Sequence, residues 1–384
     1  MSDFGVYIHL PFCLSRCGYC DFSVVTDKDD SQSAYVSALE NELEFWRERV
    51  IDAPISLYFG GGTPSRLRPE FWTRLIEKFA DLFGLTPEME ISCEANPESA
   101  SAEILSLWKD SGVNRISLGV QTFRPEHLSN LDRRHDPQEA IAAVERIREA
   151  GFDNWSLDLI YGLPGQTLDE WKADLKIALS LEPPHLSFYN LILHPGHPTT
   201  EKAEAAMTPN SEDIQSEMFL LACETLQSNG FEVYELSNAA KPGRACRHNL
   251  LYWRGGEWLG LGMSGSSFFW KSYFHNPKVW PIYLNAWESV PSDLPFKVKQ
   301  ASWEAQLLDF VMLRLRTSEG FMIAELEDLL GRNVGIDFRR LLLEMKNHGY
   351  TQSDEDRVAL TPPGWLVHSE ITSRILECLL RKEA

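Results

Sequence analysis

Short apolar runs alternate with amphipathic stretches over about the first 235 residues of the chain. Runs rich in β-branched and aromatic residues predict strands, at residues 5–10, 55–59, 89–95, 114–120, 154–160 and 185–191. Apolar residues at helical spacing predict helices between them, at residues 33–46, 70–83, 102–112, 137–151 and 168–180. Six repeated strand–helix units predict an α/β fold with a TIM-like (β/α)6 barrel, either complete or partial with one open side.

The rhythm changes after residue 235. Residues 235–270 are rich in glycine and aromatic side chains and follow neither period, so we expect an extension that packs beside the barrel. Three helical patterns then follow, at residues 302–317, 323–331 and 336–348. A short β-like run at residues 358–361 and a final helix at residues 362–384 come after them. The sequence therefore predicts three units: a barrel core over 1–235, an extension over 236–295 and a small, α-rich, winged-helix-like module over 296–384.

Charge and composition narrow the range of partners. The chain has 56 Asp and Glu against 36 Lys and Arg, a net charge of -20 that repels phosphate backbones and anionic lipid surfaces. The last module is itself acidic, which argues against a DNA-binding regulator. We find no signal-peptide pattern and no membrane-spanning segment, and the 7 cysteines are an odd number. A reducing cytoplasmic location without nucleic acid is the expectation.

Cys13, Cys17 and Cys20 form a C-x3-C-x2-C pattern. Three thiolates with short gaps can wrap one loop around an iron–sulfur cluster and leave one iron open. A zinc site is the alternative, and it would need a fourth ligand such as His9. Because no second Cys or His pair follows at zinc-finger spacing, the pattern favours the cluster.

The stretch "YFGGGTPS", residues 58–65, follows a predicted strand directly. Its three glycines allow the backbone to approach a ligand closely, while Pro64 fixes the exit of the turn. Taken alone, such a run is also compatible with an ordinary tight turn.

The cysteine pattern, with Tyr19 before the third cysteine, resembles the signature of the radical S-adenosylmethionine (SAM) superfamily. This resemblance implies a 4Fe-4S cluster in which three irons take the cysteines and the fourth takes SAM, which one electron cleaves to a radical. The glycine run resembles the motif that receives the SAM amino group. An electron donor would then be a partner.

Further motifs resemble one branch of that superfamily, namely oxygen-independent coproporphyrinogen III oxidases and HemW-type heme chaperones. They are "YIHLPFC", "EANPES", "NRISLGVQTF", "DLIYGLPGQT" and "LTPPGW", and they cover nearly the whole chain. The resemblance implies that Tyr7, Gly61 and Glu94 hold the cluster-bound SAM. It links a second SAM to Gly62, Thr63, Gln121, Arg133 and Asp158.

Each of these polar residues also has a structural alternative. Glu94 and Asp158 could cap turns, Arg133 could be an exposed charge, and Gln121 could satisfy backbone groups inside the barrel. Because they fall together at the ends of predicted strands, where barrel active sites form, we expect one shared site.

Two features separate the oxidases from the heme chaperones. The oxidase pattern has a further cysteine two residues after the third, where this chain has Phe22. Residues 247–253, "RHNLLYW", match the H-N-x-x-Y-W heme motif of the chaperones, whose fixed positions are His248, Asn249, Tyr252 and Trp253. Both features favour a heme chaperone.

The chemistry of this motif suits heme. His248 offers an axial nitrogen, Tyr252 an oxygen donor and Trp253 a flat apolar face. Nearby arginines could pair with the propionates, namely Arg244, Arg247 and Arg254. The alternative is structural: His248 and Asn249 satisfy buried backbone, and the aromatic pair fills a seam.

One departure from the family concerns residues 260–269, "GLGMSGSSFF". HemW-type chains often have G-x-G-A-H-G here, and this chain lacks that histidine. Its role is absent, or is taken by His275 or another residue.

The sequence thus predicts a heme chaperone that binds heme and passes it to an acceptor protein, with a 4Fe-4S cluster and SAM. The alternative is an oxygen-independent coproporphyrinogen III oxidase, which decarboxylates propionates oxidatively.

Overall fold

A computed structural model describes residues 3–50, 52–193, 195–205, 212–354 and 356–380. Within these ranges a sheet of 12 strands runs in the order β12-β11-β10-β9-β1-β2-β3-β4-β5-β6-β8-β7. Its middle is a parallel run of six consecutive strands, β1 (Phe4–Leu10), β2 (Ser56–Gly61), β3 (Glu90–Ala95), β4 (Arg115–Gln121), β5 (Trp155–Tyr161) and β6 (His185–Asn190). All six predicted strands and the partial barrel are confirmed.

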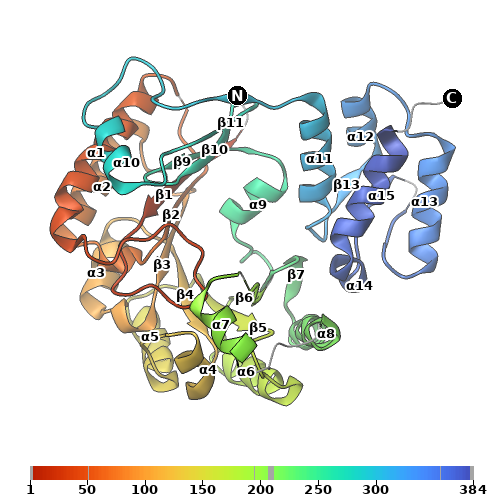
Figure 1. Cartoon of the computed structure of the whole chain (residues 1–384), viewed down its shortest axis with the longest axis horizontal. Helices are drawn as coiled ribbons and strands as arrows, with labels where there is room; N and C mark the ends of the chain where they lie inside the picture. The colour runs from red at the N-terminus through yellow and green to blue at the C-terminus, as the bar shows by residue number, and fades with distance from the viewer. Residues whose placement is uncertain (1–2, 51, 194, 206–211, 355, 381–384) are drawn as a thin grey trace.

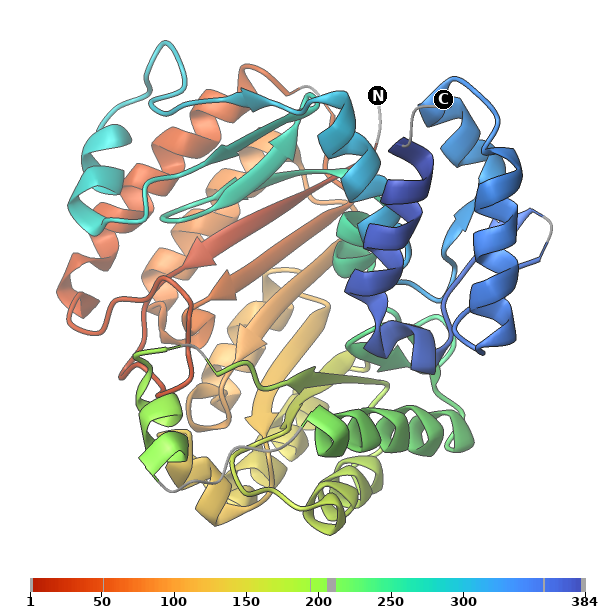
Figure 2. The ribbon, with the colours of Figure 1, turned by 45° about the vertical axis from the view of Figure 1, so that its right-hand side comes forward.

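Helices cover the outer face of this curved sheet (Figures 1 and 2). The predicted ones are α1 (Gln32–Arg47), α2 (Pro69–Phe83), α3 (Ala102–Asp110), α5 (Pro137–Glu149) and α6 (Leu168–Ser180). The expectation did not include α4 (Pro125–Asn130), α7 (Pro198–Ala205), α8 (Glu212–Ser228) or the 3-10 turns η1 (Asp29–Ser31), η2 (Pro64–Arg66) and η3 (Pro97–Ser99). Large apolar side chains from the helices, such as Trp72 and Trp171, are fully buried against the sheet.

The segment expected to pack beside the barrel instead joins its sheet. Strand β9 (Glu257–Leu261) pairs parallel to β1, and β10 (Ser266–Phe269), β11 (Ser272–His275) and β12 (Lys299–Gln300) continue antiparallel. At the other edge lie β8 (Asn238–Ala240) and β7 (Glu232–Glu235). Glycines interrupt the alternation of side chains in this segment, so the sequence does not show its strands. Glycine is needed at Gly260 because a Cβ there would lie 2.1 Å from the Ser266 carbonyl oxygen.

The last module holds α11 (Trp303–Arg314), β13 (Phe321–Met322), α12 (Ile323–Leu330), α13 (Gly335–Asn347), β14 (Arg357–Val358), α14 (Pro362–Leu366) and α15 (His368–Leu380). The expected helices and the β-like run are present, and β14 pairs antiparallel with the unexpected β13. Helix α9 (Arg247–Trp253) lies between the sheet and α11 (Figures 1 and 2). The division of the chain at residues 235 and 295 stays a prediction.

No helix in the described ranges is long and apolar enough to cross a membrane.

A buried carboxylate fastens the added strands to the barrel. Glu42 of α1 is fully buried and accepts hydrogen bonds from the Gly262 backbone N–H at 2.9 Å, Asn276 Nδ2 at 2.6 Å and the Tyr283 hydroxyl at 2.8 Å. Tyr283 belongs to α10 (Trp280–Ala286), so one side chain joins α1, the end of β9 and α10. Burial raises the pKa of Glu42 from 4.5 to about 7.

We predict a pH-dependent stability difference between the wild type and Glu42→Gln. Because the folded carboxyl binds its proton more tightly than the unfolded one, its contribution to stability is full below pH 4.5 and is lost as the pH rises to about 7. The unfolding free energy of the wild type minus that of Glu42→Gln should fall by up to about 3 kcal/mol across this window and stay level above it. Urea denaturation at a series of pH values measures this. Parallel pH profiles for the two proteins would contradict it.

Candidate functional site

The ends of β1 and β2 approach each other so closely that only glycine fits. Gly61 has φ +107°, and a Cβ there would lie 2.3 Å from the His9 ring. A Cβ on Gly62 would lie 2.6 Å from the Pro11 carbonyl carbon. The Gly62 and Thr63 backbone N–H groups donate to the Leu10 and Phe12 carbonyls, both at 2.9 Å. The glycine run thus holds the start of the cysteine segment against the sheet.

The three cysteines lie on a loop closed at its base and docked at its far end. The Cys13 N–H donates to the Val25 carbonyl at 2.9 Å, and the Val25 N–H donates to Pro11 at 2.8 Å. Further along, the Gly18 N–H donates to the Leu131 carbonyl at 3.2 Å. All three thiols are free and half-buried, so one loop presents three available sulfurs.

His9 braces this loop. Its Nε2 meets the Ser23 carbonyl at 2.7 Å, its Nδ1 meets the Tyr7 hydroxyl at 3.1 Å, and the ring is buried. Both nitrogens therefore have partners within the chain. Among the described residues, no three His, Cys, Asp or Glu side chains converge tightly enough to enclose a single metal ion. His9, the fourth ligand that the zinc alternative would need, thus has both ring nitrogens engaged in hydrogen bonds.

A cavity of about 500 Å³ opens beside the cysteine loop at the carboxyl ends of the parallel strands. Ten of the predicted site residues line it: Cys13, Cys17, Cys20, Gly61, Gly62, Thr63, Glu94, Gln121, Arg133 and Asp158. Tyr7 does not line it, but its ring stacks at 6.1 Å on Tyr58, which does. The structure thus gathers the residues that the sequence placed in one site.

Two carboxyl groups stand in the cavity wall. Glu94 accepts from the Gly61 N–H and from the Tyr58 hydroxyl, both at 3.0 Å, and burial raises its pKa to about 7. Asp158 accepts from the Ser117 hydroxyl at 2.9 Å and the Ser156 hydroxyl at 3.1 Å, and burial raises its pKa too. Such carboxyls can accept hydrogen bonds from the hydroxyl or amino groups of a ligand.

Arg133 and Gln121 complete the wall. The Arg133 guanidinium donates to Asn96 Oδ1 at 2.8 Å and to the Gly119 carbonyl at 2.7 Å, so it is not the exposed charge of the structural alternative. Gln121 has φ +71°, at a register shift between β4 and β5. A left-handed non-glycine residue at a cavity is the kind of strain that functional sites retain.

Large apolar side chains surround the mouth of this cavity. Leu14, Phe22, Tyr189 and Ile192 all line it and are 50%, 61%, 41% and 66% exposed. Together they form an apolar rim, the kind of exposed patch that borders ligand-binding grooves.

The predicted heme segment lies at the opposite, amino-terminal end of the strands. His248 of α9 is 1% exposed. Its Nδ1 meets the hydroxyl of Ser56, the first residue of β2, at 2.8 Å, and its Nε2 meets the Tyr252 hydroxyl at 2.7 Å. Its backbone N–H donates to Glu90, the first residue of β3, at 2.9 Å. Burial lowers the pKa of His248 to about 3, so the imidazole is neutral.

Trp253, at the end of the segment, contacts the last module. The Arg316 guanidinium lies over the Trp253 ring at 4.3 Å and pairs with buried Glu235 at 3.6 Å. Asn249 is half-buried in the same helix. These contacts agree with the alternative in which Trp253 fills a seam. A porphyrin here would have to displace Arg316 or stack on the opposite face of the Trp253 ring.

The arginines expected to meet propionates have partners within the chain. Arg244 pairs with Asp153 at 3.2 Å, Arg247 donates to the Glu88 carbonyl, and Arg254 pairs with Glu319. His275 lies on β11 and bonds to Ser266.

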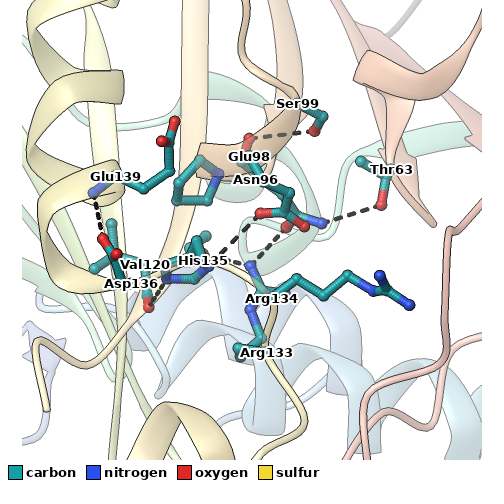
Figure 3. Close-up of polar contacts among 12 residues, drawn as sticks. Thr63, Asn96, Glu98, Ser99, Val120, Arg133, Arg134, His135, Asp136 and Glu139 are labelled. Atoms are coloured by element: carbon teal, nitrogen blue, oxygen red, sulfur yellow. Dashed lines mark hydrogen bonds and ion pairs between the residues drawn. The ribbon is translucent and has the colours of Figure 1, made fainter. Parts of the chain in front are cut away.

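Sequence reasoning missed two residues that connect these parts. Tyr58 lines the cavity and bonds Glu94, while its ring stacks on His248 at 5.1 Å, so it spans the distance between cavity and α9. Asn96 joins Thr63 and Arg133 (Figure 3). Its place two residues after Glu94, directly past the end of a strand, was the available signal.

The chain is similar in sequence to known proteins. Residues 7–178 match the model of the Radical SAM superfamily, and residues 302–367 match the HemN C-terminal domain. The chain is 32% identical over 374 residues to the heme chaperone HemW of Lactococcus lactis, covering 97% of both chains. It is 31% identical to HemW of Bacillus subtilis, covering 97% of this chain and 99% of that one.

A solved structure shows the same fold. Coproporphyrinogen III oxidase (HemN) of Escherichia coli superposes with a TM-score of 0.81 at 23% identity, over 97% of this chain and 90% of that one. Over nearly their whole lengths, the chain and its HemW relatives share one sequence pattern on this fold. The chain therefore belongs to the HemW family of the radical SAM superfamily.

Proposed function

We propose that the protein is a heme chaperone that binds heme at α9 and transfers it to an acceptor protein. One observation carries the proposal: the H-N-x-x-Y-W segment folds as a single helix that holds a neutral imidazole, His248, beside the Tyr252 phenol. A neutral histidine can ligate heme iron without first losing a proton. The chain's kinship with relatives named heme chaperones supports the same conclusion.

Heme binding at His248 requires a local rearrangement. Nε2 already meets the Tyr252 hydroxyl, so iron would replace this hydrogen bond. Nδ1 stays bonded to Ser56, which would keep the ring orientated while Nε2 changes partner. The seam between α9 and the last module, where Arg316 covers Trp253, is the side from which a flat ring would enter.

We also propose that Cys13, Cys17 and Cys20 hold a 4Fe-4S cluster and that the adjoining cavity binds SAM. When bound, the cluster supplies a single electron for cleavage of SAM. Glu94 would accept from the ribose or amine, and Gly61 would keep the backbone close to the ligand. Tyr7 would support Tyr58 from below, and Gln121, Arg133 and Asp158 would form the remaining wall.

A cytoplasmic location fits this chemistry, since Cys13, Cys17 and Cys20 must remain reduced thiols to hold the cluster. The acceptor protein and an electron donor are the partners that the proposal requires.

The oxidase alternative is supported by one feature, the apolar rim around the cavity mouth, which would suit a porphyrinogen. Phe22 on that rim cannot replace a thiol. An anaerobic assay with SAM, reductant and coproporphyrinogen III, analysed by mass, separates the functions. We expect no loss of carboxyl groups. Conversion of propionate to vinyl would make the protein an oxidase.

We predict that His248→Ala weakens heme binding at least tenfold. The variant removes the proposed iron ligand, whereas His275→Ala removes an exposed histidine on β11 and should bind as the wild type does. Titration of anaerobically reconstituted protein by Soret absorbance measures both. Equal weakening by His275→Ala would move the ligand to β11, and unchanged binding by both variants would remove α9 from the proposal.

Tyr252→Phe distinguishes the two donors of the segment. If His248 is the ligand, loss of the phenol frees Nε2, and heme affinity should rise by a few-fold, because a net hydrogen bond is worth about 1 kcal/mol. If the phenol oxygen is the ligand, affinity should fall. The same titration, with the Soret maximum compared between variants, gives the answer.

A further inference from the structure

Two hydrogen-bond donors point at cysteine sulfurs in the cavity wall. The Arg133 guanidinium, through Nη1, lies 3.7 Å from Cys17 Sγ. The Thr63 hydroxyl lies 3.6 Å from Cys13 Sγ. Both are ordinary distances for hydrogen bonds to sulfur, which is a large and diffuse acceptor. Thus two of the three sulfurs each have a polar side chain within hydrogen-bond distance.

The side-chain amide of Asn96 fixes the direction of these hydrogen bonds. An arginine can only donate, so the Asn96 atom that it meets at 2.8 Å is the amide oxygen. The amide nitrogen, Nδ2, must then face Thr63 Oγ1, at 3.1 Å (Figure 3). Because the Thr63 oxygen accepts this bond, its own hydrogen is free for the sulfur of Cys13. The amide therefore sets the direction of both donors.

We propose that Thr63, Asn96 and Arg133 form a clamp that directs two hydrogen bonds at the cluster sulfurs and raises the reduction potential of the cluster. Hydrogen bonds to sulfur and a nearby positive charge favour the reduced state, which carries one more negative charge. Asn96 is a positioning residue here, since it touches no sulfur. The inference rests on the cluster of the proposed function and is independent of heme.

The clamp also has a rigid support. Arg133 Nη2 is held by the Gly119 carbonyl at 2.7 Å, at the register shift in β4. The Thr63 backbone is tied to Phe12, next to Cys13, at 2.9 Å. Donors fixed in this way lose little entropy on meeting the sulfurs, so they act on the potential without rearrangement.

The test is a redox titration of the reconstituted cluster without SAM, followed by the EPR signal of the reduced state. Thr63→Val keeps the shape and removes the hydroxyl. At a fixed potential we expect the oxidised-to-reduced ratio of the cluster to be about tenfold higher in Thr63→Val than in the wild type. For one electron this corresponds to a reduction potential about 59 mV more negative. Thr63→Ser retains the donor and should match the wild type.

Asn96→Asp tests the positioning role. A carboxylate still accepts from Arg133 but cannot donate, so the Thr63 hydroxyl turns to the carboxylate and leaves Cys13. The shift should be at least as large as in Thr63→Val. Ser99→Ala is the matched control. The Ser99 hydroxyl meets Ser65 at 2.6 Å and donates to the Asn96 backbone carbonyl at 3.2 Å, but it touches neither the Asn96 side-chain amide nor a sulfur, so its loss should leave the potential unchanged.

Three results would overturn the proposal. Thr63→Val and Asn96→Asp could both keep the wild-type potential, or Ser99→Ala could shift it equally. The third is loss of iron from Thr63→Val and Asn96→Asp but not from Ser99→Ala, which would mean that the clamp holds the cluster instead of tuning it. If the wild type takes up no cluster, the cluster assignment itself is wrong. If the variants shift the potential as expected but the protein binds no heme, only the heme-chaperone proposal is wrong.

Discussion

The close approach of β1 and β2 at Gly61 and Gly62 is the constraint on which the cavity depends. There is no room for a Cβ between these residues and His9 or Pro11, so the two strand ends can meet only if both positions are glycine. This contact sets the base of the cysteine loop, and it also aims the Gly61 N–H at Glu94. Glycine costs conformational entropy in a strand. Here that cost is offset by the hydrogen bonds that hold the cysteine loop and by the bond from Gly61 to Glu94.

The same strands carry a second polar centre at their other end. Helix α9 is tied to the first residues of β2 and β3 through Ser56 and Glu90, while Glu94 closes the cavity at the end of β3. Tyr58 lies between them, bonded to Glu94 and stacked on His248. Tyr58 therefore contacts both of the places at which we propose ligands, the cavity for SAM and α9 for heme.

Much of this could be predicted from the sequence, because the relevant signals are local. Strand and helix periods identified the six parallel strands. The resemblance to the radical SAM superfamily supplied the polar residues of the cavity wall, and their positions at strand ends indicated one shared site. The placement of α9 could not be predicted, since it depends on a long-range contact between His248 and Ser56. Strand β9 was not recognised from the hydrophobic pattern, because Gly260 within it and Gly262 after it occupy positions where the neighbouring backbone leaves no room for a side chain. The tie between Asn96 and Arg133 joins two loops, so no single stretch reveals it.

The most direct test of the account is the distance between the two cofactors. Dipolar EPR on mildly oxidised protein measures it, because a cluster that has lost its open iron (the 3Fe-4S form) and ferric heme are then both paramagnetic. Because cavity and α9 lie at opposite ends of strands six or seven residues long, the account predicts a separation of about 20 Å. Strong coupling that puts the heme iron next to the cluster would contradict it, because the porphyrin would then lie in the apolar mouth of the cavity.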